Sequence, residues 1–177
     1  MIKKSRIYVL DTSAILSGKP INISDAKLVT TPLVASELKP GGRDYQNFQF
    51  MKEKGLEIHV PSEDATKKIL GVSKETGDLP RLSRTDVQIM ALALDLSEDD
   101  NNDVMILTDD YSIQNVASEL NIKFEPISQS GITKRFKWIY QCRGCGKKFK
   151  ENISICPICG ARTRDTISNK KSLRRRK

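Results

Sequence analysis

The sequence predicts an α/β protein, in which a parallel sheet flanked by helices is followed by a small cysteine-rich module. Short apolar runs alternate with helical patterns over the first 125 residues, and all four cysteines come later. The charge divides in the same way. Residues 1–133 hold 15 Lys and Arg against 20 Asp and Glu, whereas residues 134–177 hold 15 against 2. The net charge of +8 therefore combines an acidic body of −5 with a basic extension of +13.

Five short apolar runs predict strands, at residues 7–10, 27–31, 56–60, 104–108 and 123–125. Helical patterns lie at residues 33–39, 44–54, 62–76, 84–97 and 111–120. In the fourth of these patterns Val87, Met90 and Leu94 recur on one helical face. Strands that alternate with helices in this way predict a parallel sheet.

Length and composition narrow the class of protein. A chain of 177 residues accommodates one domain of roughly 100–150 residues and a smaller one. No apolar run approaches the ~20 residues that cross a bilayer. Only four apolar residues, 7–10, lie between the basic first six residues and Asp11, too few for the core of a signal peptide. We therefore expect a cytoplasmic protein that does not bind membranes.

The cysteines form two CxxC pairs, Cys142 with Cys145 and Cys156 with Cys159, separated by ten residues. Each pair turns sharply and directs two sulfurs at one centre, so the spacing predicts a zinc ribbon. Four sulfur ligands leave no open position, which makes such a site structural. The alternative is two disulfides or four free thiols, and disulfides need an oxidising compartment.

Basic residues surround the cysteines, with aromatic residues between them. Phosphates pair with such cations and bases stack on such rings, so the pattern favours single-stranded RNA. Alternatively, the basic residues only aid solubility, and the aromatic residues form the small core of the ribbon. The candidate RNA-binding residues are Lys134, Arg135, Lys137, Arg143, Lys147, Lys148, Lys150, Arg162 and Arg164.

Five acidic residues stand at or near the ends of predicted strands. Asp11 directly follows the first strand, and Asp109 and Asp110 follow the fourth. Glu37 lies in the helix after the second strand, and Asp86 is in the first turn of the fourth helical pattern. The carboxyl ends of parallel strands share one edge of the sheet, where α/β proteins place their sites. Converging carboxylates favour Mg²⁺ or Mn²⁺. Taken singly, these residues are also explained as helix caps or solvated acids.

The acidic residues resemble the active-site pattern of PIN-domain nucleases. In that pattern an Asp follows the first strand, a Glu lies on the next helix, an Asp belongs to a Ser-x-x-Asp helix start, and Thr-x-Asp follows a later strand. Asp11, Glu37, Asp86 and Asp110 match it in order, with Asp109 as the less certain partner. The resemblance implies that these carboxylates hold one or two Mg²⁺ or Mn²⁺ ions, and we expect the Ser13 and Thr108 hydroxyls to orient ligands or water.

The whole chain, with Thr-Asp-Asp-Tyr-Ser-Ile-Gln-Asn at 108–115 and the zinc ribbon, resembles the Nin one binding protein family in its archaeal form. That resemblance implies a metal-dependent endoribonuclease that cleaves precursor small-subunit rRNA to form its mature 3′ end. The implied partners are this RNA and the pre-ribosomal particle with its assembly factors. The rival functions are a PIN-type toxin ribonuclease, which normally lacks the ribbon, and a non-catalytic RNA-binding assembly factor.

The predicted organisation has four parts. Residues 1–126 form the PIN-like nuclease domain and residues 127–137 a linker. Residues 138–164 form the zinc ribbon, and residues 165–177 form a basic, disordered tail. A terminal segment dominated by Lys and Arg buries too little apolar surface to order itself.

Overall fold

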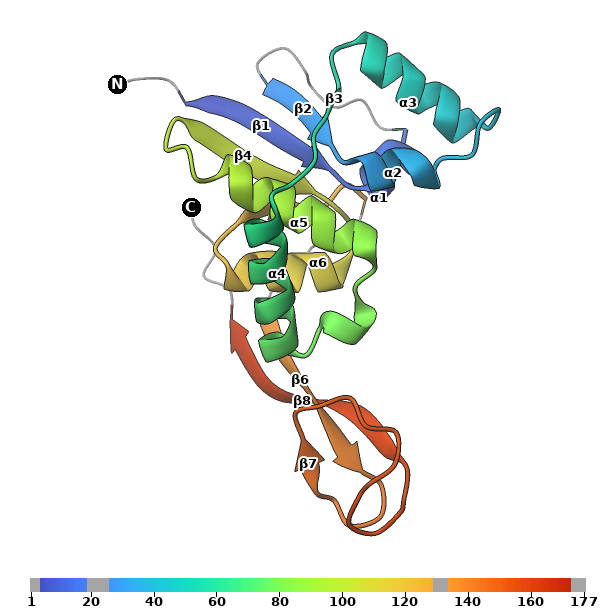
Figure 1. Ribbon diagram of the computed structural model, residues 1–177, viewed down its shortest axis with the longest axis vertical. Helices are drawn as coiled ribbons and strands as arrows, with labels where there is room; N and C mark the ends of the chain where they lie inside the picture. The colour runs from blue at the N-terminus through green and yellow to red at the C-terminus, as the bar shows by residue number, and fades with distance from the viewer. Residues whose placement is uncertain (1–3, 19–25, 129–133, 173–177) are drawn as a thin grey trace.

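The structure is a computed structural model that describes residues 4–18, 26–128 and 134–172. Its larger part is a five-stranded parallel sheet in the order β3-β2-β1-β4-β5 (Figure 1). The strands are β1 Ser5–Leu10, β2 Ala26–Thr30, β3 Glu57–Ile58, β4 Asn102–Leu107 and β5 Lys123–Glu125. All five lie within or close to the predicted runs, and every neighbouring pair is parallel. The predicted α/β fold is therefore confirmed.

The helices follow the predicted patterns to within one or two residues. They are α1 Thr12–Leu16, α2 Pro32–Glu37, α3 Arg43–Glu53, α4 Glu63–Thr76, α5 Arg84–Leu96 and α6 Tyr111–Glu119, with a short 3₁₀ helix, η1, at Leu79–Arg81. Helices α1 and η1 have no counterpart among the predicted patterns, because five and three residues are too few to show a helical period. Among the described residues, no helix combines the length and the apolar character that crossing a membrane requires.

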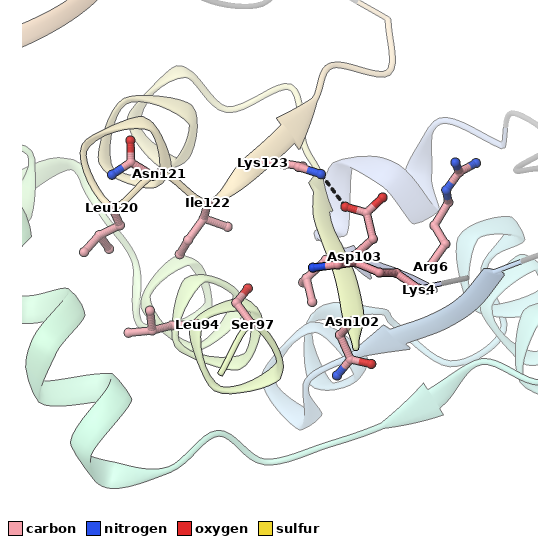
Figure 2. Close-up of a pocket in the computed structure, with 11 residues that line it drawn as sticks. Lys4, Arg6, Leu94, Ser97, Asn102, Asp103, Leu120, Asn121, Ile122 and Lys123 are labelled. Carbon is pink, nitrogen blue, oxygen red and sulfur yellow. Dashed lines mark hydrogen bonds and ion pairs between the residues drawn. The ribbon is translucent and has the colours of Figure 1, made fainter. Parts of the chain in front are cut away.

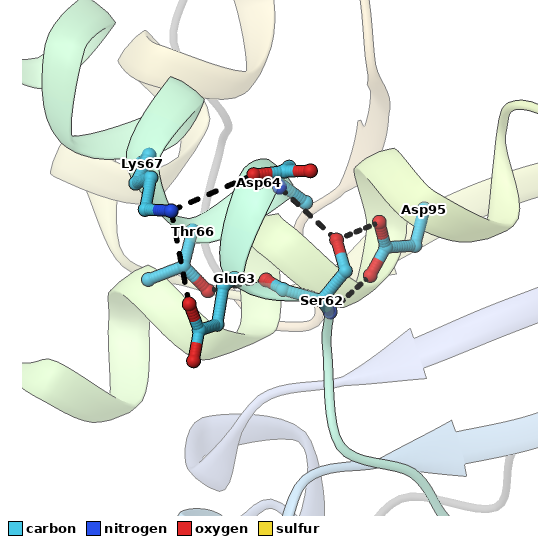
Figure 3. Close-up of polar contacts among 7 residues, drawn as sticks. Ser62, Glu63, Asp64, Thr66, Lys67 and Asp95 are labelled. Carbon is cyan, nitrogen blue, oxygen red and sulfur yellow. Dashed lines mark hydrogen bonds and ion pairs between the residues drawn. The ribbon is translucent and has the colours of Figure 1, made fainter.

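The start of α4 is attached to the end of α5 (Figure 3). Ser62 caps α4, since its Oγ accepts a hydrogen bond from the backbone N–H of Ala65 at 3.1 Å. Asp95, near the end of α5, accepts bonds from the Ser62 backbone N–H and Oγ at 2.6 and 2.7 Å. On the solvent side, Lys67 pairs with Glu63 and Asp64 of its own helix. The Asp95 carboxylate therefore links the capping residue of α4 to the end of α5.

The hydrophobic core lies between the sheet and its helices. Side chains from every layer are fully buried there, as shown by Val9 of β1, Ile106 of β4, Ile89 of α5 and Ile113 of α6. Helix α5 packs against β1 and β4, and α4 packs against α5 and α6. This packing covers the central strands, so their apolar runs are nearly continuous rather than alternating.

The second sheet is antiparallel, in the order β7-β6-β8, and it extends away from the body (Figure 1). Its strands are β6 Lys134–Cys142, β7 Lys148–Phe149 and β8 Thr163–Ser172. The prediction of a disordered tail is therefore wrong for residues 165–172, which pair with β6 along its length. Local composition argued against a strand, but the backbone hydrogen bonds of β6 order this segment. Residues 173–177 lie outside the described part.

The predicted linker also contains ordered structure. Ile127 packs against the core of the body, and residues 134–137 belong to β6. The connection is thus shorter than residues 127–137, because its first residue packs on the body and its last four belong to a strand of the ribbon. Residues 129–133 lie outside the described part, and the exact domain boundaries stay a prediction.

The body and the ribbon meet where α4 ends and η1 begins. The guanidinium carbon of Arg81 lies 4.1 Å from the centroid of the Trp138 ring, and Arg81 also pairs with Asp165 of β8. Gly77 ends α4 in the left-handed region, with φ of 79°. A Cβ atom at Gly77 would lie 2.6 Å from the backbone oxygen of Trp138. The two modules therefore share a close contact that only glycine permits at this point.

Candidate active site and metal centre

The candidate active site lies at the carboxyl ends of β1 and β4, which are neighbours in the centre of the sheet. Leu10 pairs with Leu107 at the last residue of each strand. The chain leaves β1 toward β2 on one side, while β4 lies on the other side. Such a reversal of strand order opens a crevice at the carboxyl edge of a parallel sheet. Asp11 and Thr108 are the first residues beyond the two strands.

Asp11 is the most buried of the candidate carboxylates, with 5% of its surface exposed. It accepts hydrogen bonds from the Thr12 backbone N–H at 2.7 Å and from the hydroxyls of Ser13 and Thr108, both at 2.8 Å. Burial raises the pKa of Asp11 and the charge of Asp110 raises it further, while the three hydrogen bonds act in the opposite direction. The structure thus places Ser13 and Thr108 as partners of Asp11.

Asp110 and Asp86 both cap helices, as the alternative explanation had it. Asp110 accepts a hydrogen bond from the Ser112 backbone N–H at 2.6 Å at the start of α6. Asp86 forms a capping box with Ser83 at the start of α5. Burial raises the pKa of Asp86, and the charges of Asp11 and Asp110 raise it further. The caps therefore bring three carboxylates close enough for their charges to interact.

Glu37, at the end of α2, is held by two threonines that were not among the predicted site residues. Its Oε2 accepts a bond from the Thr12 hydroxyl at 2.6 Å, and its Oε1 accepts one from the Thr85 hydroxyl at 2.5 Å. The sequence did contain a signal, because each threonine is next to a predicted carboxylate, Asp11 or Asp86. Glu37 is therefore oriented by two groups at the site and is more than a solvated helix residue.

Asp109 is oriented toward a different part of the molecule. Its carboxylate accepts hydrogen bonds from the backbone N–H groups of Ile127 at 2.8 Å and Ser128 at 3.0 Å, and from the Ser128 hydroxyl. Its own backbone N–H donates to Ser13 Oγ at 3.2 Å. Asp109 thus attaches the segment after β5 to the site, while Asp11, Asp86 and Asp110 are coupled by their charges.

The carboxylates offer the oxygen ligands of a hard divalent cation, but among the described residues only the four cysteines bring their ligand atoms close enough together to hold an ion as the structure stands. Carboxylate oxygens are the ligands that Mg²⁺ and Mn²⁺ prefer. Asp11 and Asp86 have raised pKa values, and part of each shift comes from other carboxylates. Since a positive charge placed between them would relieve this repulsion, the electrostatics and the ligand chemistry agree.

The four cysteines of the ribbon are brought together as predicted. Their Sγ atoms all lie within 4.8 Å of one another. Cys142 and Cys159 are 3.3 Å apart and Cys145 and Cys156 are 3.7 Å apart, measured between Sγ atoms. A tetrahedron of sulfurs with metal–sulfur bonds of about 2.3 Å has edges of about 3.8 Å. No disulfide joins any of the four, so the disulfide alternative is wrong, and the geometry of the four sulfurs fits a metal ion.

Glycines allow the sharp turns around this cluster. Gly146 and Gly160 both have φ of 72°, which side chains rarely adopt. At Gly144 a Cβ atom would lie 2.9 Å from the Cβ of Ala161. The Gly144 and Cys145 backbone N–H groups donate to Cys142 Sγ at 3.3 and 3.4 Å. The knuckles therefore stabilise a sulfur ligand with backbone donors as well as by shape.

A separate cavity of about 600 Å³ lies at the opposite, amino edge of the sheet (Figure 2). Arg6 of β1 and Asn102 and Asp103 of β4 line it, and Asp103 pairs with Lys123 of β5. None of the predicted site residues lies there. The residues predicted for catalysis follow the carboxyl ends of the strands, and this cavity is formed by the amino ends.

A parallel sheet with clustered carboxylates at its carboxyl edge and a four-cysteine module after it is the framework of a metal-dependent nuclease class. Residues 8–96 match the family described as PIN domain of ribonuclease. Endoribonuclease Nob1 of Archaeoglobus fulgidus is 35% identical over 160 residues, which cover 90% of each chain. Ribonuclease VapC1 of Thermoplasma acidophilum is 36% identical over 176 residues, which cover 99% of this chain and 86% of the relative.

The 20S-pre-rRNA D-site endonuclease nob1 of Schizosaccharomyces pombe is 28% identical over 135 residues, which cover 76% of this chain and 33% of that protein. The chain belongs to the PIN-domain ribonuclease family that includes the archaeal Nob1 endoribonucleases. The predicted family and the predicted enzyme class, an endoribonuclease, are thereby confirmed. The individual roles of the site residues stay a prediction.

Proposed function

We propose that this protein cleaves precursor small-subunit rRNA and forms its mature 3′ end. The observation that carries the proposal is the joint presence of the carboxylate cluster and the basic four-cysteine ribbon on one chain. The name of the Schizosaccharomyces pombe relative supports pre-rRNA as the substrate class. The proposal includes action in the cytoplasm, on a pre-ribosomal particle and beside its assembly factors.

In this proposal Asp11, Glu37, Asp86 and Asp110 hold one or two Mg²⁺ or Mn²⁺ ions. A bound divalent ion supplies an activated water and stabilises charge on the phosphodiester during in-line displacement. The Ser13 and Thr108 hydroxyls fix the orientation of Asp11 through the 2.8 Å bonds that they donate. Such fixed orientation matters because a misplaced ligand loses much of the catalytic effect.

Two further threonines belong to the proposed site. Thr12 and Thr85 each donate to one oxygen of Glu37, so that both oxygens of this carboxylate are held in a fixed orientation. We assign Asp109 the role of an anchor for residues 127–128, because its carboxylate already accepts several bonds from them. Asp110 is therefore the better candidate for the ligand that follows β4.

The ribbon supplies RNA affinity in this proposal, and Zn²⁺ held by the four cysteines supplies its stability. Lys147 and Arg162 are exposed beside the knuckles, as are Arg143 and Arg164. An acidic active site repels phosphates, so phosphate contacts in a separate basic module are expected to position the RNA. Lys134 and Arg135, also predicted to bind RNA, lie on the first half of β6.

A second candidate function is that of a toxin-type ribonuclease, because one relative is named Ribonuclease VapC1 and its match covers 99% of this chain. That match extends over the cysteine module, so the presence of the ribbon does not distinguish the two candidate functions. The alternative is a toxin-type ribonuclease with another RNA as its target. The two functions differ in product: only the first one yields a single mapped cut at the 3′ end of small-subunit rRNA.

The decisive experiment is a cleavage assay on a precursor small-subunit rRNA fragment with Mn²⁺ or Mg²⁺. We expect the full chain to release a spacer with a 5′-phosphate and leave a 3′-hydroxyl on the rRNA. Asp11→Asn should lower the rate by about 100-fold or more, since it removes a charged group at the reacting centre. Asp103→Asn, at the other end of β4, is the matched control and should cleave normally.

RNA binding provides the second readout of this assay. Asp11→Asn should bind the fragment as tightly as the unmodified chain, because the phosphate contacts lie in the ribbon. Full cleavage by Asp11→Asn would remove Asp11 from the mechanism. Metal-independent binding without any cleavage would favour the non-catalytic assembly factor, and cuts spread over unrelated RNAs would favour the toxin-type ribonuclease.

A further inference from the structure

A groove of about 1040 Å³ separates the body from the ribbon, away from the candidate active site. One wall comes from the end of α4 and from η1, and the other from β6 and β7. The residues that matter for its chemistry are Lys74, Leu79, Lys137, Trp138, Lys148 and Phe149. Its volume lies just above the usual range for ligand pockets, about 300–1,000 Å³.

The charge of the groove is positive although one of its walls belongs to the acidic body. Four lysines line it, against two glutamates. Lys137, Lys148 and Lys150 come from the ribbon, and Lys74 comes from α4 of the body. All four are exposed. A polyanion therefore meets cations from both walls at once, which a ribbon alone does not offer.

The surface between the lysines is apolar and aromatic. Tyr140 and Phe149 are cross-strand partners in β6 and β7. Tyr140 is buried, while Phe149 stays half-buried and lines the groove. Leu79 and Pro80 lie on the opposite wall. Flat apolar surface flanked by cations matches a nucleobase and its phosphates, the combination by which proteins bind single-stranded nucleic acid.

The two walls are held in place before any ligand arrives. Arg81 stacks on Trp138 and pairs with Asp165, which links η1 to both long strands of the ribbon. Beside it, Asn115 of α6 donates to the buried carboxylate of Asp78 at 2.6 Å. A preformed groove binds with less loss of conformational entropy than one that must assemble around its ligand.

We propose that this groove binds a single-stranded stretch of the RNA substrate, with a base against Phe149 and phosphates on Lys74 and the lysines of the ribbon. The proposal rests on the proposed function in one respect, that RNA is the substrate. It adds a binding site that includes the body and assigns Lys74 to it. The flanking charge selects a polyanion, and the aromatic surface selects unpaired bases over a duplex.

The test measures binding separately from cleavage. Each variant is made in the full-length Asp11→Asn chain, and its affinity for a fluorescent 12-nucleotide single-stranded RNA is measured over a series of salt concentrations. Lys74→Glu should weaken binding about three- to tenfold and reduce the slope against salt by about one. Lys68→Glu is the matched control, because Lys68 is exposed on the same helix and does not line the groove.

A second variant tests the aromatic surface. Phe149→Leu keeps an apolar side chain beside Tyr140 and removes the ring, so binding should weaken about fivefold or more. An RNA that carries 5-bromouridine should crosslink to residues 148–150 in the Asp11→Asn chain. Circular dichroism and the zinc content of each variant show whether the ribbon is still folded. If the ribbon of Phe149→Leu is unfolded, Lys74→Glu and the crosslink test the proposal instead.

The proposal fails if Lys74→Glu and Lys68→Glu have the same affinity, or if a 12-base-pair RNA duplex competes as well as the single strand. It also fails if a polyglutamate peptide of the same net charge as the RNA displaces it and no crosslink reaches residues 148–150. That result would favour an acidic protein as the partner. These outcomes do not depend on catalysis. A chain that binds RNA in the groove but does not cut would overturn the proposed function and leave this site in place.

Discussion

The body and the ribbon of this protein reach a folded state by different means. The body buries large aliphatic side chains such as Leu10, Ile69 and Met90 completely. In the described part of the ribbon, the buried residues that are not metal-ligand candidates are Ile139 and Tyr140, each 8% exposed. Each fully buried aliphatic side chain contributes about 1.5–3 kcal/mol. We therefore expect the stability of the ribbon to depend on its four cysteines and that of the body to be independent of them.

This difference explains where each module can place its charges. The apolar core of the body offsets the cost of burying Asp11 and of clustering other carboxylates beside it. The ribbon has little core, and its basic residues remain exposed around the metal ligands. A small module that gains its stability from a bound metal could carry a dense positive charge on its surface, because its stability would not come from that surface.

The largest effect is expected when the metal ligands of the ribbon are removed. Metal binding contributes roughly 10–16 kcal/mol to small zinc modules. Cys142→Ser, or chelation of the metal, should therefore unfold the ribbon and leave the body folded. Trp138, the single tryptophan of the chain, lies in the ribbon and reports the change by fluorescence, while circular dichroism reports the helices of the body.

The control for that experiment is Lys147→Ser, an exposed position between the two cysteine pairs. It should keep its metal and its tryptophan fluorescence. Loss of the helical signal together with the tryptophan signal in Cys142→Ser would mean that the body also needs the metal. The contrast between the two modules would then be wrong.

A smaller effect is expected at the contact between the modules. Gly77→Ala forces a side chain into the left-handed region and within 2.6 Å of the Trp138 backbone oxygen. It should lower the free energy of unfolding by about 2–4 kcal/mol and shift the Trp138 fluorescence. Gly71→Ala in the same helix meets no atom within 4 Å, so it should raise stability by about 0.5–1 kcal/mol. Equal results for both variants would show that the contact does not constrain the modules.

The smallest effect concerns the buried carboxylate next to that contact. Burial raises the pKa of Asp78, and hydrogen bonds from Thr76 and Asn115 oppose the shift only in part. The folded state therefore binds this proton more tightly than the unfolded state. As pH rises from the ordinary value of 3.8 toward the raised one, the contribution of Asp78 to stability falls, by at most about 1.4 kcal/mol per pH unit.

Asp78→Asn removes this titration. Urea unfolding of both proteins should be measured between pH 4 and 7. The free energy of unfolding of the native chain should fall relative to that of Asp78→Asn as pH rises, and the difference should become constant once Asp78 is ionised. Asp100→Asn, an exposed position, is the control and should follow the native chain throughout. A stability difference that grows in favour of the native chain with rising pH would contradict the raised pKa.

Local pattern was sufficient for much of this protein. Periodicity placed the strands and the longer helices, because each needs only its own apolar face. The spacing of the cysteines predicted a shared metal centre, since two turns of this length direct their sulfurs inward. The position of Asp11 and Asp110 after their strands predicted that both lie at the carboxyl edge of the sheet.

Contacts between distant segments decided the rest. Strand β8 is ordered by its pairing with β6, although its own composition predicts disorder. Glu37 gains its orientation from Thr85, 48 residues away, and Asp109 is directed to Ile127 and Ser128 rather than to the other carboxylates. The sequence by itself determined which residues are candidates for the chemistry and which local structure holds each one. Only the tertiary structure decided the partner of each carboxylate, because a hydrogen bond depends on a spatial proximity that no local pattern encodes.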